Sequence, residues 1–561
     1  MGETANHNHD HNHDHNHGPP PQQSGPPQQQ RPPPPNLGLS RGPAWPPNEQ
    51  LQHLDYCIHS NPRWYQAIVL AFQHYIVMLG TIVMIASNLV PQMGGNHGDK
   101  ARVIQSLLFM SGINTLLQTL IGTRLPTVMG ASLAFYLPVL SIINDTLDKT
   151  FKSEHDRFLY TMRTIQGSLI VSSFVNIILG YSRAWGNFTK YFSPIIIAAV
   201  VPVVSLGLFM RGFPMLANCV QIGLPMLIVL ILSQQYLKRL LPEHHRHVPE
   251  RYALLFCIAI IWAFAAILTV SGAYNNVKEQ TKTSCRIDRS YLLSSAPWIK
   301  VPYPFQWGTP IFRASHVFGM MGAALVSSAE STGAFFAAAR FAGATPPPAH
   351  VLSRSIGLHG IGMLLEGIFG SVVGTTASVE NIGLLGVTRI GSRRMVQIST
   401  AFMIFFSIFG KFGAFFASIP LPIFGAIYCV VLGIVVAVGI SFTQFANTNS
   451  MRNQYVLGIT LFLGISIAEY FVLNTSPSGD GPVKTPGRWF NDILNTIFSS
   501  APTVALIIGV LLDNTLEAKH SAAERGKPWW VPFQHREGDV RNEEFYRFPL
   551  RIHELIPTRF L

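Results

Sequence analysis

Runs of about 20 apolar residues recur along most of this 561-residue chain and are not confined to separate cores. A bilayer core of about 30 Å needs about 20 apolar residues in each helix that spans it. Only 12% of the residues are charged, against roughly 25% in ordinary soluble domains. The pattern excludes a typical soluble enzyme and predicts an all-α polytopic membrane protein.

The apolar runs predict fourteen spans, of which the third and tenth are poor helices. Gly, Ser and Thr interrupt both, and such backbone is tolerated at membrane depth only where it is buried or lines a cavity. If the chain consists of two repeats of seven spans, the third and tenth spans occupy equivalent positions. This predicts a 7+7 inverted repeat with its binding site at the interruptions. The alternative is two short, badly placed loops. The predicted spans lie near residues 66–88, 103–122, 126–144, 164–182, 191–210, 217–237, 252–271, 315–339, 355–374, 376–390, 395–416, 420–445, 454–473 and 489–512.

The formal net charge of +12 fits basic cytoplasmic loops better than nucleic-acid binding, because no RNA or DNA motif accompanies it. An odd repeat keeps both chain ends on one side of the membrane, and we place both termini in the cytoplasm, although loop charge supports this only weakly. No basic and apolar leader precedes the first span, so no cleavable signal peptide is expected.

Residues 1–60 differ in composition from the rest of the chain. A tract of His alternating with Asn and Asp precedes a run rich in Pro and Gln, which predicts a disordered tail. Alternating His in a flexible chain lacks preorganised ligand geometry, so a solvated tail is favoured over weak metal binding. The five cysteines lie far apart without a CxxC pair, and this spacing implies neither a disulfide framework nor a zinc site.

Four acidic residues fall within predicted spans, where an ionisable side chain costs at least about 2.5 kcal/mol and needs a reason. Glu330 and Glu380 stand among small or polar residues that leave room for a ligand. Glu366 lies among bulky apolar residues, which favours a structural hydrogen bond to a neighbouring helix. Glu469 is near a span end and can reach the interface. Gln73 and His74 form another polar island, in the first span.

No nucleotide-binding loop, zinc-protease motif or serine-hydrolase elbow is present in the sequence. We therefore expect no enzyme activity and no cofactor. Any transport must be driven by an ion gradient or proceed by downhill diffusion of the substrate. A buried carboxylate can take up a proton on one side of the membrane and release it on the other. Glu330 is the candidate for this coupling.

The segment ENIGLLGVTR (residues 380–389), the following GSRRMVQIS and the Gln-His pair of the first span resemble the signature of the nucleobase-ascorbate transporter family. These proteins are also called nucleobase:cation symporters of the xanthine and uracil permease type, and the order of segments is similar to plant members. The resemblance implies short strands interrupting spans 3 and 10, a core and a gate domain, a homodimer and an elevator-like motion. The implied domains are the transporter at 61–512, with a core at 64–185 and 315–417 and a gate at 190–313 and 420–512, and a cytoplasmic C-terminal tail at 513–561.

The same resemblance implies roles for individual residues. Glu330 matches the acid that holds the base and couples the proton, and Glu380 matches the position that holds its other edge. Ser132 and Leu133 match the strand whose backbone amide faces the ligand, although many relatives carry Phe at the position of Leu133. The other residues assigned to substrate binding are Asn381, Val379, Gln73 and His74, and those assigned to motif geometry are Gly383, Thr388 and Arg389.

The expected cargo is a neutral nucleobase, a purine or uracil or both, because two carboxylates can accept its ring N–H groups. The coupling ion is expected to be a proton in preference to sodium, and the location the plasma membrane. Ascorbate is an anion that two acids would repel, and the family's ascorbate carriers have Pro where this chain has Glu380. An ascorbate or organic anion carrier is the alternative within transport, and a non-transporting scaffold or receptor is the alternative outside it.

Overall fold

The computed structural model describes residue 51 and residues 54–147, 149–237, 242, 247–287, 296–476, 481–518, 525 and 545–546. Every described residue belongs to one unit, Ala44–Leu561. The disorder predicted for residues 1–50 and the histidine tract therefore lie outside the described residues. Residues 54–60, which the sequence assigns to the tail, are part of the fold, since Ile58 N donates to Ala342 O at 2.9 Å.

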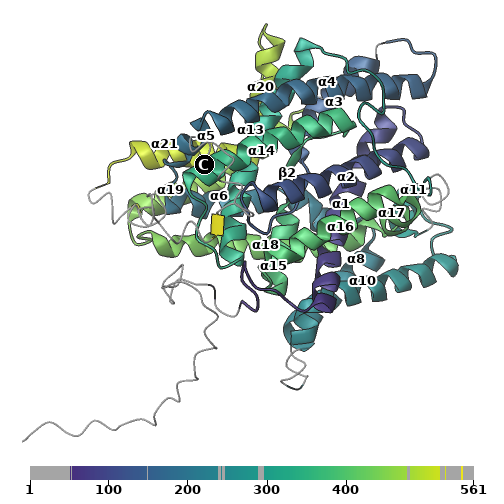
Figure 1. The fold of residues 1–561 in the computed structure, drawn as a ribbon, viewed down its shortest axis with the longest axis horizontal. Coiled ribbons are helices and arrows are strands. Elements are labelled where there is room, and N and C mark those ends of the chain that lie inside the picture. Colours follow the sequence, from purple (N-terminus) through teal and green to yellow (C-terminus); the bar gives the residue numbers. More distant parts are fainter. Residues whose placement is uncertain are drawn as a thin grey trace, which may run out of the picture. The chain divides into compact units, whose positions relative to one another are not determined.

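Helices account for most of the described chain, as an all-α membrane protein requires (Figure 1). The first part comprises α1 (Trp64–Gln92), α2 (His97–Leu120), β1 (Met129–Ala131), η1 (Leu133–Phe135), α3 (Tyr136–Leu147), α4 (Glu154–Tyr181), α5 (Ala184–Thr189), α6 (Pro194–Leu206), η2 (Phe209–Arg211), α7 (Phe213–Ala217), α8 (Val220–Ile231), η3 (Leu232–Tyr236), α10 (His247–Val270) and α11 (Glu279–Cys285). The second part comprises α13 (Ala314–Phe341), α14 (Ala349–Phe369), β2 (Thr375–Ala377), α15 (Val379–Thr388), α16 (Arg393–Ile408), α17 (Gly410–Ala417), α18 (Leu421–Ser441), η5 (Phe442–Phe445), α19 (Met451–Leu473), α20 (Arg488–Phe498) and α21 (Ala501–Thr515).

Among the described residues, seven helices are long and apolar enough to cross a membrane, or eight if one bent pair is counted as a span. That pair is α20 and α21, which meet at 85°. The prediction of one continuous helix over 489–512 is therefore wrong. Ser499 and Ser500 lie at the break, and Ser500 followed by Pro502 in the first turn of α21 is the sequence signal that marks a helix start there.

Both predicted strands are present, and they pair with each other. β1 and β2 form a two-stranded antiparallel sheet in which Gly130 faces Thr376. Each strand is followed by a serine that caps the next helix: Ser132 accepts from the amide of Ala134 at 3.2 Å, and Ser378 accepts from the amide of Asn381 at 3.3 Å. Serine is a favoured N-cap because its hydroxyl accepts from one of the free amides of the first turn.

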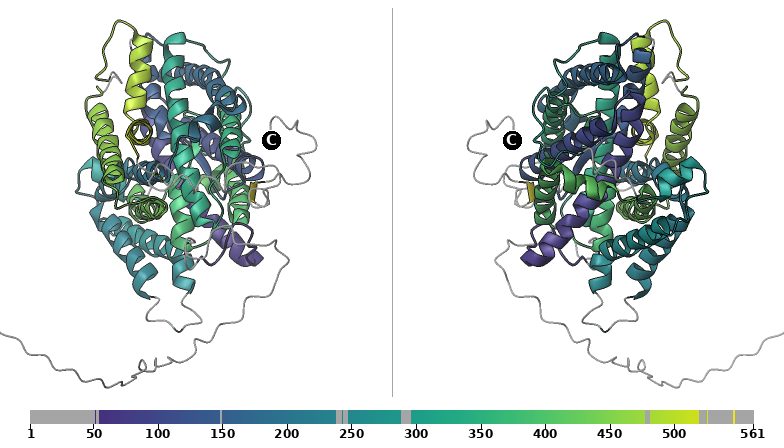
Figure 2. Two further views of the ribbon diagram at one scale, coloured as in Figure 1. Left: turned by 90° about the vertical axis from the view of Figure 1, so that its left-hand side faces the viewer. Right: turned by 90° about the vertical axis from the view of Figure 1, so that its right-hand side faces the viewer.

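Small residues allow the long helices to pack closely around this sheet. α4 packs along α14 and α13, and α2 packs along α16 (Figure 1). A Cβ atom at Gly180 of α4 would collide with the backbone of Gly357 on α14, and such small-residue contacts let membrane helices approach. α10 and α19, both from the segments predicted to form the gate, lie along the same flank (Figure 2).

A disulfide joins Cys219, just before α8, to Cys285 at the end of α11, with their Cα atoms 5.4 Å apart. The expectation of no disulfide is wrong for these two, because the fold brings together residues that lie 66 positions apart. Cys57, Cys257 and Cys429 are free thiols.

The segment 296–313, which follows this disulfide, lies against the ends of α14 and α16 and against the first half of α4. The amide of Lys300 donates to Ile408 O at 3.0 Å, and that of Phe305 donates to Ile368 O at 2.7 Å. Ile311 N donates to Arg163 O at 2.9 Å. The segment thus connects the disulfide-bonded part of the chain to α4, α14 and α16.

The opposite helix ends contact the described residues of the predicted C-terminal tail. Arg393 donates to the carbonyl oxygen of Phe545 at 3.0 Å, and Arg354 donates to that of Tyr546 at 3.1 Å. The hydroxyl of Tyr546 donates to Thr345 O. Part of the segment predicted as a tail therefore folds back onto the helices.

Candidate functional site

Glu380 lies in the first turn of α15, immediately after β2 and its serine cap, and is only 3% exposed. Thr81 of α1 donates to its Oε1 at 3.2 Å, and Ser378 donates to its Oε2 at 2.9 Å. Arg211 forms an ion pair with the same Oε1 atom. The carboxylate is thus held from three different elements, two of them distant in sequence.

Arg211 reaches this carboxylate from η2, a single turn between α6 and α7. It is 6% exposed, and its Nε atom is buried without a hydrogen-bond partner. A buried donor left unpaired costs about 1 to 3 kcal/mol. The site therefore contains a cation with one hydrogen-bonding group free to take an acceptor.

Glu330 lies on α13, which packs against β2. Its neighbour Ser331 fixes the helix to β2, contacting Thr376 at 3.1 Å and accepting from the amide of Ala377 at 3.0 Å. The Glu330 carboxylate accepts from the hydroxyl of Ser500, at the α20–α21 break, over 3.4 Å. The charges of Arg211 and Glu380 both act on it. The two carboxylates predicted from the sequence therefore form one electrostatic cluster.

Asn381 and His74 support the geometry around Glu380. The His74 ring Nδ1 lies 3.0 Å from Oδ1 of Asn381, whose Nδ2 donates to Ser378 at 3.0 Å. This network fixes the amide and the cap that orient the first turn of α15. Gln73, in contrast, donates to the backbone carbonyl of Arg251 at 2.8 Å, so the structure directs it to α10 and not to the carboxylates.

The residues after the two strands begin helices. The Ser132 amide donates to Gly374 O at 2.8 Å, so the strand pairing continues through it, and the role of this strand in facing the ligand stays a prediction. Leu133 starts η1 and is partly buried. Val379 is the buried first residue of α15.

The remaining motif residues shape α15. A Cβ atom at Gly383 would collide with the backbone of Val431 on α18, so the glycine allows these helices to touch. Thr388 donates to the carbonyl of Leu384 at 2.7 Å. Arg389 ends the helix in the left-handed region, with φ of 58°, and its carbonyl accepts from the amide of Asp55 at 3.0 Å.

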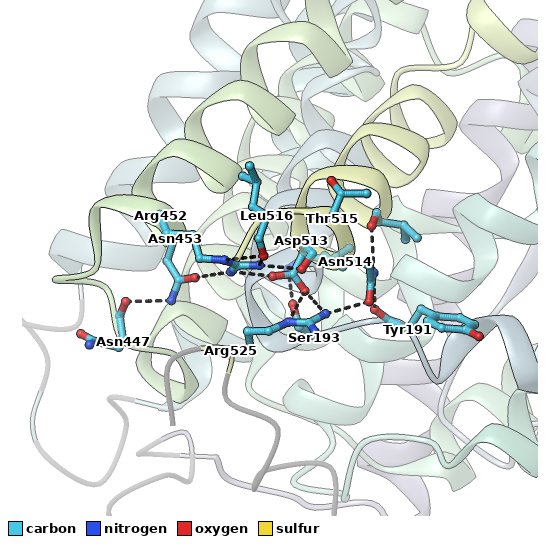
Figure 3. Close-up of polar contacts among 12 residues, drawn as sticks. Tyr191, Ser193, Asn447, Arg452, Asn453, Asp513, Asn514, Thr515, Leu516 and Arg525 are labelled. Atoms are coloured by element: carbon cyan, nitrogen blue, oxygen red, sulfur yellow. Dashed lines mark hydrogen bonds and ion pairs between the residues drawn. The ribbon is translucent and has the colours of Figure 1, made fainter. Parts of the chain in front are cut away.

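A second buried ion-pair cluster, at the ends of α19 and α21, serves as a contrast (Figure 3). Asp513 is fully buried, and its two carboxylate oxygens accept from Arg452 and Arg525, each at 2.8 or 2.9 Å. Arg452 also donates to the backbone carbonyl of Asp513 at 2.5 Å. This cluster holds helix ends and the residue at 525 together, and each carboxylate oxygen of the acid accepts from its own guanidinium group.

Comparison with known proteins identifies the family of the chain. The model of a permease family, Xan_ur_permease, matches residues 65–473. Nucleobase-ascorbate transporter 3 of Arabidopsis thaliana is 71% identical over all of both chains. The chain belongs to the nucleobase-ascorbate transporter family. Nucleobase-ascorbate transporter 2 of the same plant is 57% identical, over 91% of this transporter and 98% of its own length. A solved structure of SLC26A9 aligns with 72% of this chain and 62% of its own, with 12% identity and a TM-score of 0.42, too low for a conclusion about the fold.

Sequence reasoning found the two central acids of this transporter but missed their partners. Arg211 falls one residue beyond the predicted end of the fifth span. Ser500 lies inside the predicted span 489–512, and Thr81 is one polar residue in a long apolar run. The structural hydrogen bond predicted for Glu366 is confirmed, since Asn114 donates to its Oε1 at 3.0 Å.

Proposed function

We propose that this transporter imports nucleobases, purines or uracil or both, by proton symport across the plasma membrane. The observation that carries the proposal is the group of charged side chains around Glu380: Arg211 pairs with it, and Glu330, on the helix that Ser331 fixes to β2, interacts with both charges. Ring N–H groups of a base can donate to these carboxylates through charge-assisted hydrogen bonds. Half-helices that begin at the middle of the membrane are where secondary transporters bind their substrates.

Glu330 is the proposed proton carrier. It is partly exposed, whereas Glu380 is buried and compensated by Arg211. Its hydrogen bond from Ser500, at 3.4 Å, is long and can be replaced by a ligand donor with little loss. A carboxylate that is partly accessible and weakly held is better suited to exchanging protons than one locked in an ion pair.

The proposed architecture is fourteen spans in a 7+7 inverted repeat with core and gate domains, working as a homodimer. The order of long helix, long helix, short strand, serine cap and helix occurs at α1 to α3 and again at α13 to α15, which supports the repeat. The Cys219–Cys285 disulfide supports an outside position for residues 272–314, because disulfides persist in oxidising compartments. That orientation leaves both termini in the cytoplasm.

An ascorbate or organic anion carrier is the second candidate, and Arg211 favours it. The guanidinium offsets one of the two negative charges at the site, so repulsion of an anion is weaker than two bare carboxylates would cause. We still favour a neutral base, because Glu330 keeps a further acidic group beside the pair.

The test is uptake of radiolabelled uracil, xanthine and ascorbate into transport-deficient cells that express the chain. Uptake of a base that rises with outside acidity and falls with a protonophore supports the proposal. Uptake of ascorbate alone supports the second candidate. If none of the three compounds is taken up although the protein is verified at the plasma membrane, the result contradicts transport and favours a scaffold or receptor.

A further inference from the structure

A small cavity, away from the carboxylates, lies where α17 packs against α2 and α16 (Figure 1). Ala101, Ile104, Gln105 and Leu108 form its wall on α2. Their spacing of three, one and three positions places them on one face of the helix. The rest of the lining, from α16, α17 and residue 296, is apolar. The cavity is therefore an apolar space with one amide side chain in it.

The amide of Gln105 lacks a partner. Gln105 is 6% exposed, and its Nε2 atom has no hydrogen bond in the structure. Gly410, at the break between α16 and α17, leaves the space that this amide occupies, because a Cβ atom there would collide with Nε2. A buried donor is costly to leave without an acceptor. The amide therefore points to a ligand that brings an acceptor into the cavity.

Two basic side chains flank the cavity. Arg102 follows the lining residue Ala101 and is exposed. Lys300 lies beside the break between α16 and α17, since its amide donates to Ile408 O at 3.0 Å. Burial lowers the pKa of the Lys300 ammonium, and the like charge of Arg102 lowers it further. An anion placed between the two side chains would relieve this repulsion.

Asp99 is the acid whose charge opposes that of Arg102 at Lys300. Its Oδ2 atom accepts from the amide of Asn96 at 3.0 Å and lies 3.1 Å from Nδ1 of His155. The carboxylate is thus engaged at the start of α2 and balances only part of the positive charge of Arg102 and Lys300.

We propose that this cavity binds an anionic phospholipid. The phosphate lies between Arg102 and Lys300, an ester carbonyl accepts from Nε2 of Gln105, and the acyl chain follows the apolar wall of α2. Basic pockets between membrane helices bind anionic lipid head groups. A zwitterionic lipid fits less well, because its own cation would meet the two basic side chains. Inorganic phosphate has neither an ester nor a chain to fill the apolar part.

The surface beside the cavity is suited to this occupant. Phe405 and Phe415 adjoin the lining in the chain and are 46% and 47% exposed. Large apolar side chains exposed on helices of a membrane protein contact lipid. A lipid can therefore reach the cavity from the bilayer without passing through the site at Glu380, and the inference does not depend on the cargo.

The experiment measures binding to the delipidated full-length protein in a non-ionic detergent. Dioleoylphosphatidylglycerol, dioleoylphosphatidylcholine and inorganic phosphate are titrated separately, and thermal stabilisation and native mass spectrometry report binding. The variants are Gln105→Leu, which keeps the size and removes the donor, and Lys300→Gln. The matched control is Lys152→Gln, which removes an exposed lysine of the connection between α3 and α4.

Phosphatidylglycerol should stabilise the wild type and Lys152→Gln more than either other probe does. Its apparent affinity should fall by about 5-fold or more in Gln105→Leu and in Lys300→Gln. Without lipid, Gln105→Leu should be at least as stable as wild type, because it removes an unpaired buried donor. A purely structural role of the glutamine would give the opposite result.

An equal response to the two lipids overturns the inference, because it would mean general contact with lipid. A response to inorganic phosphate equal to that of phosphatidylglycerol also overturns it, as a free-anion site. So does an affinity that is unchanged in the two variants or lowered as much in Lys152→Gln. If Gln105→Leu does not fold, Lys300→Gln decides. None of these results bears on the proposed function, which the uptake assay tests separately.

Discussion

Replacing Glu380 with Gln tests whether the ion pair is the electrostatic centre of the site. The amide keeps the size of the side chain but leaves the charge of Arg211 uncompensated in a buried position. Removing one partner of a buried pair costs about 3 to 5 kcal/mol. The amide also turns an NH2 group toward a hydroxyl donor, Thr81 or Ser378, although either hydroxyl can rotate and accept.

We therefore expect Glu380→Gln to lower the free energy of unfolding by about 3 to 5 kcal/mol, measured by thermal or denaturant unfolding of the purified protein in detergent. The double variant Glu380→Gln with Arg211→Gln should recover part of this loss, because it removes the uncompensated charge. The coupling energy of such a cycle between contacting residues is about 0.5 to 3 kcal/mol. Glu330→Gln, which has a single long hydrogen bond from Ser500, is the control and should lose less.

The same variant should change which bases compete for uptake. A ligand whose donor no longer meets an acceptor loses about 1 to 3 kcal/mol, or roughly 5-fold to 150-fold in affinity. Bases with an acceptor at that edge should lose least. Competition by uracil, adenine, guanine, xanthine and uric acid gives the ranking. A Glu380→Gln protein as stable as wild type, with an unchanged ranking and no gain in the double variant, would refute the ion pair as the centre of the site.

Further perturbations test the rest of the structure. Glu330→Gln should abolish concentrative uptake while the protein stays in the membrane, and accumulation against a gradient by that variant would contradict its coupling role. Gly383→Ala should lower both stability and uptake, because its methyl group would collide with the Val431 backbone; Gly433→Ala, with open space around it, is the control. Replacing Cys219 and Cys285 with Ser should cost up to about 4 kcal/mol of unfolding free energy on the chain-entropy model, and no loss in a reductant-free unfolding assay would count against a formed disulfide. Deleting residues 1–50 should leave the KM for uptake unchanged, and loss of transport by a correctly localised truncation would show that the tail takes part.

The sequence predicted those features that a local pattern can reveal. Glu330 and Glu380 were found because a charge at membrane depth is rare and the residues around each are small. Gly, Ser and Thr at membrane depth oppose a continuous helix and so predict the two interruptions; the strands at those interruptions are implied by the family resemblance. Both signals are local, so they need no knowledge of which segments become neighbours.

The features that the sequence did not reveal depend on contacts between distant segments. Arg211 lies 169 residues from Glu380, and Cys219 lies 66 residues from Cys285. Neither residue is unusual in its own neighbourhood: an arginine near a span end is ordinary, and a cysteine beside an apolar stretch packs like any small apolar residue. The hydrogen bond from the Ser132 amide to Gly374 O is likewise a contact between distant segments.

The disulfide limits how far the two predicted domains can move apart. Without it, the chain leaving α10 at Val270 would have 30 residues before the amide of Lys300 meets α16. With Cys285 fixed beside α8, the connection is 15 residues long and spans at most about 50 Å when fully extended. This exceeds the hydrocarbon thickness of about 30 Å, so the bond leaves room for vertical travel. The disulfide halves the length of the connecting segment. Its reduction should therefore increase the largest separation that the connection allows between the domains, without altering either binding carboxylate.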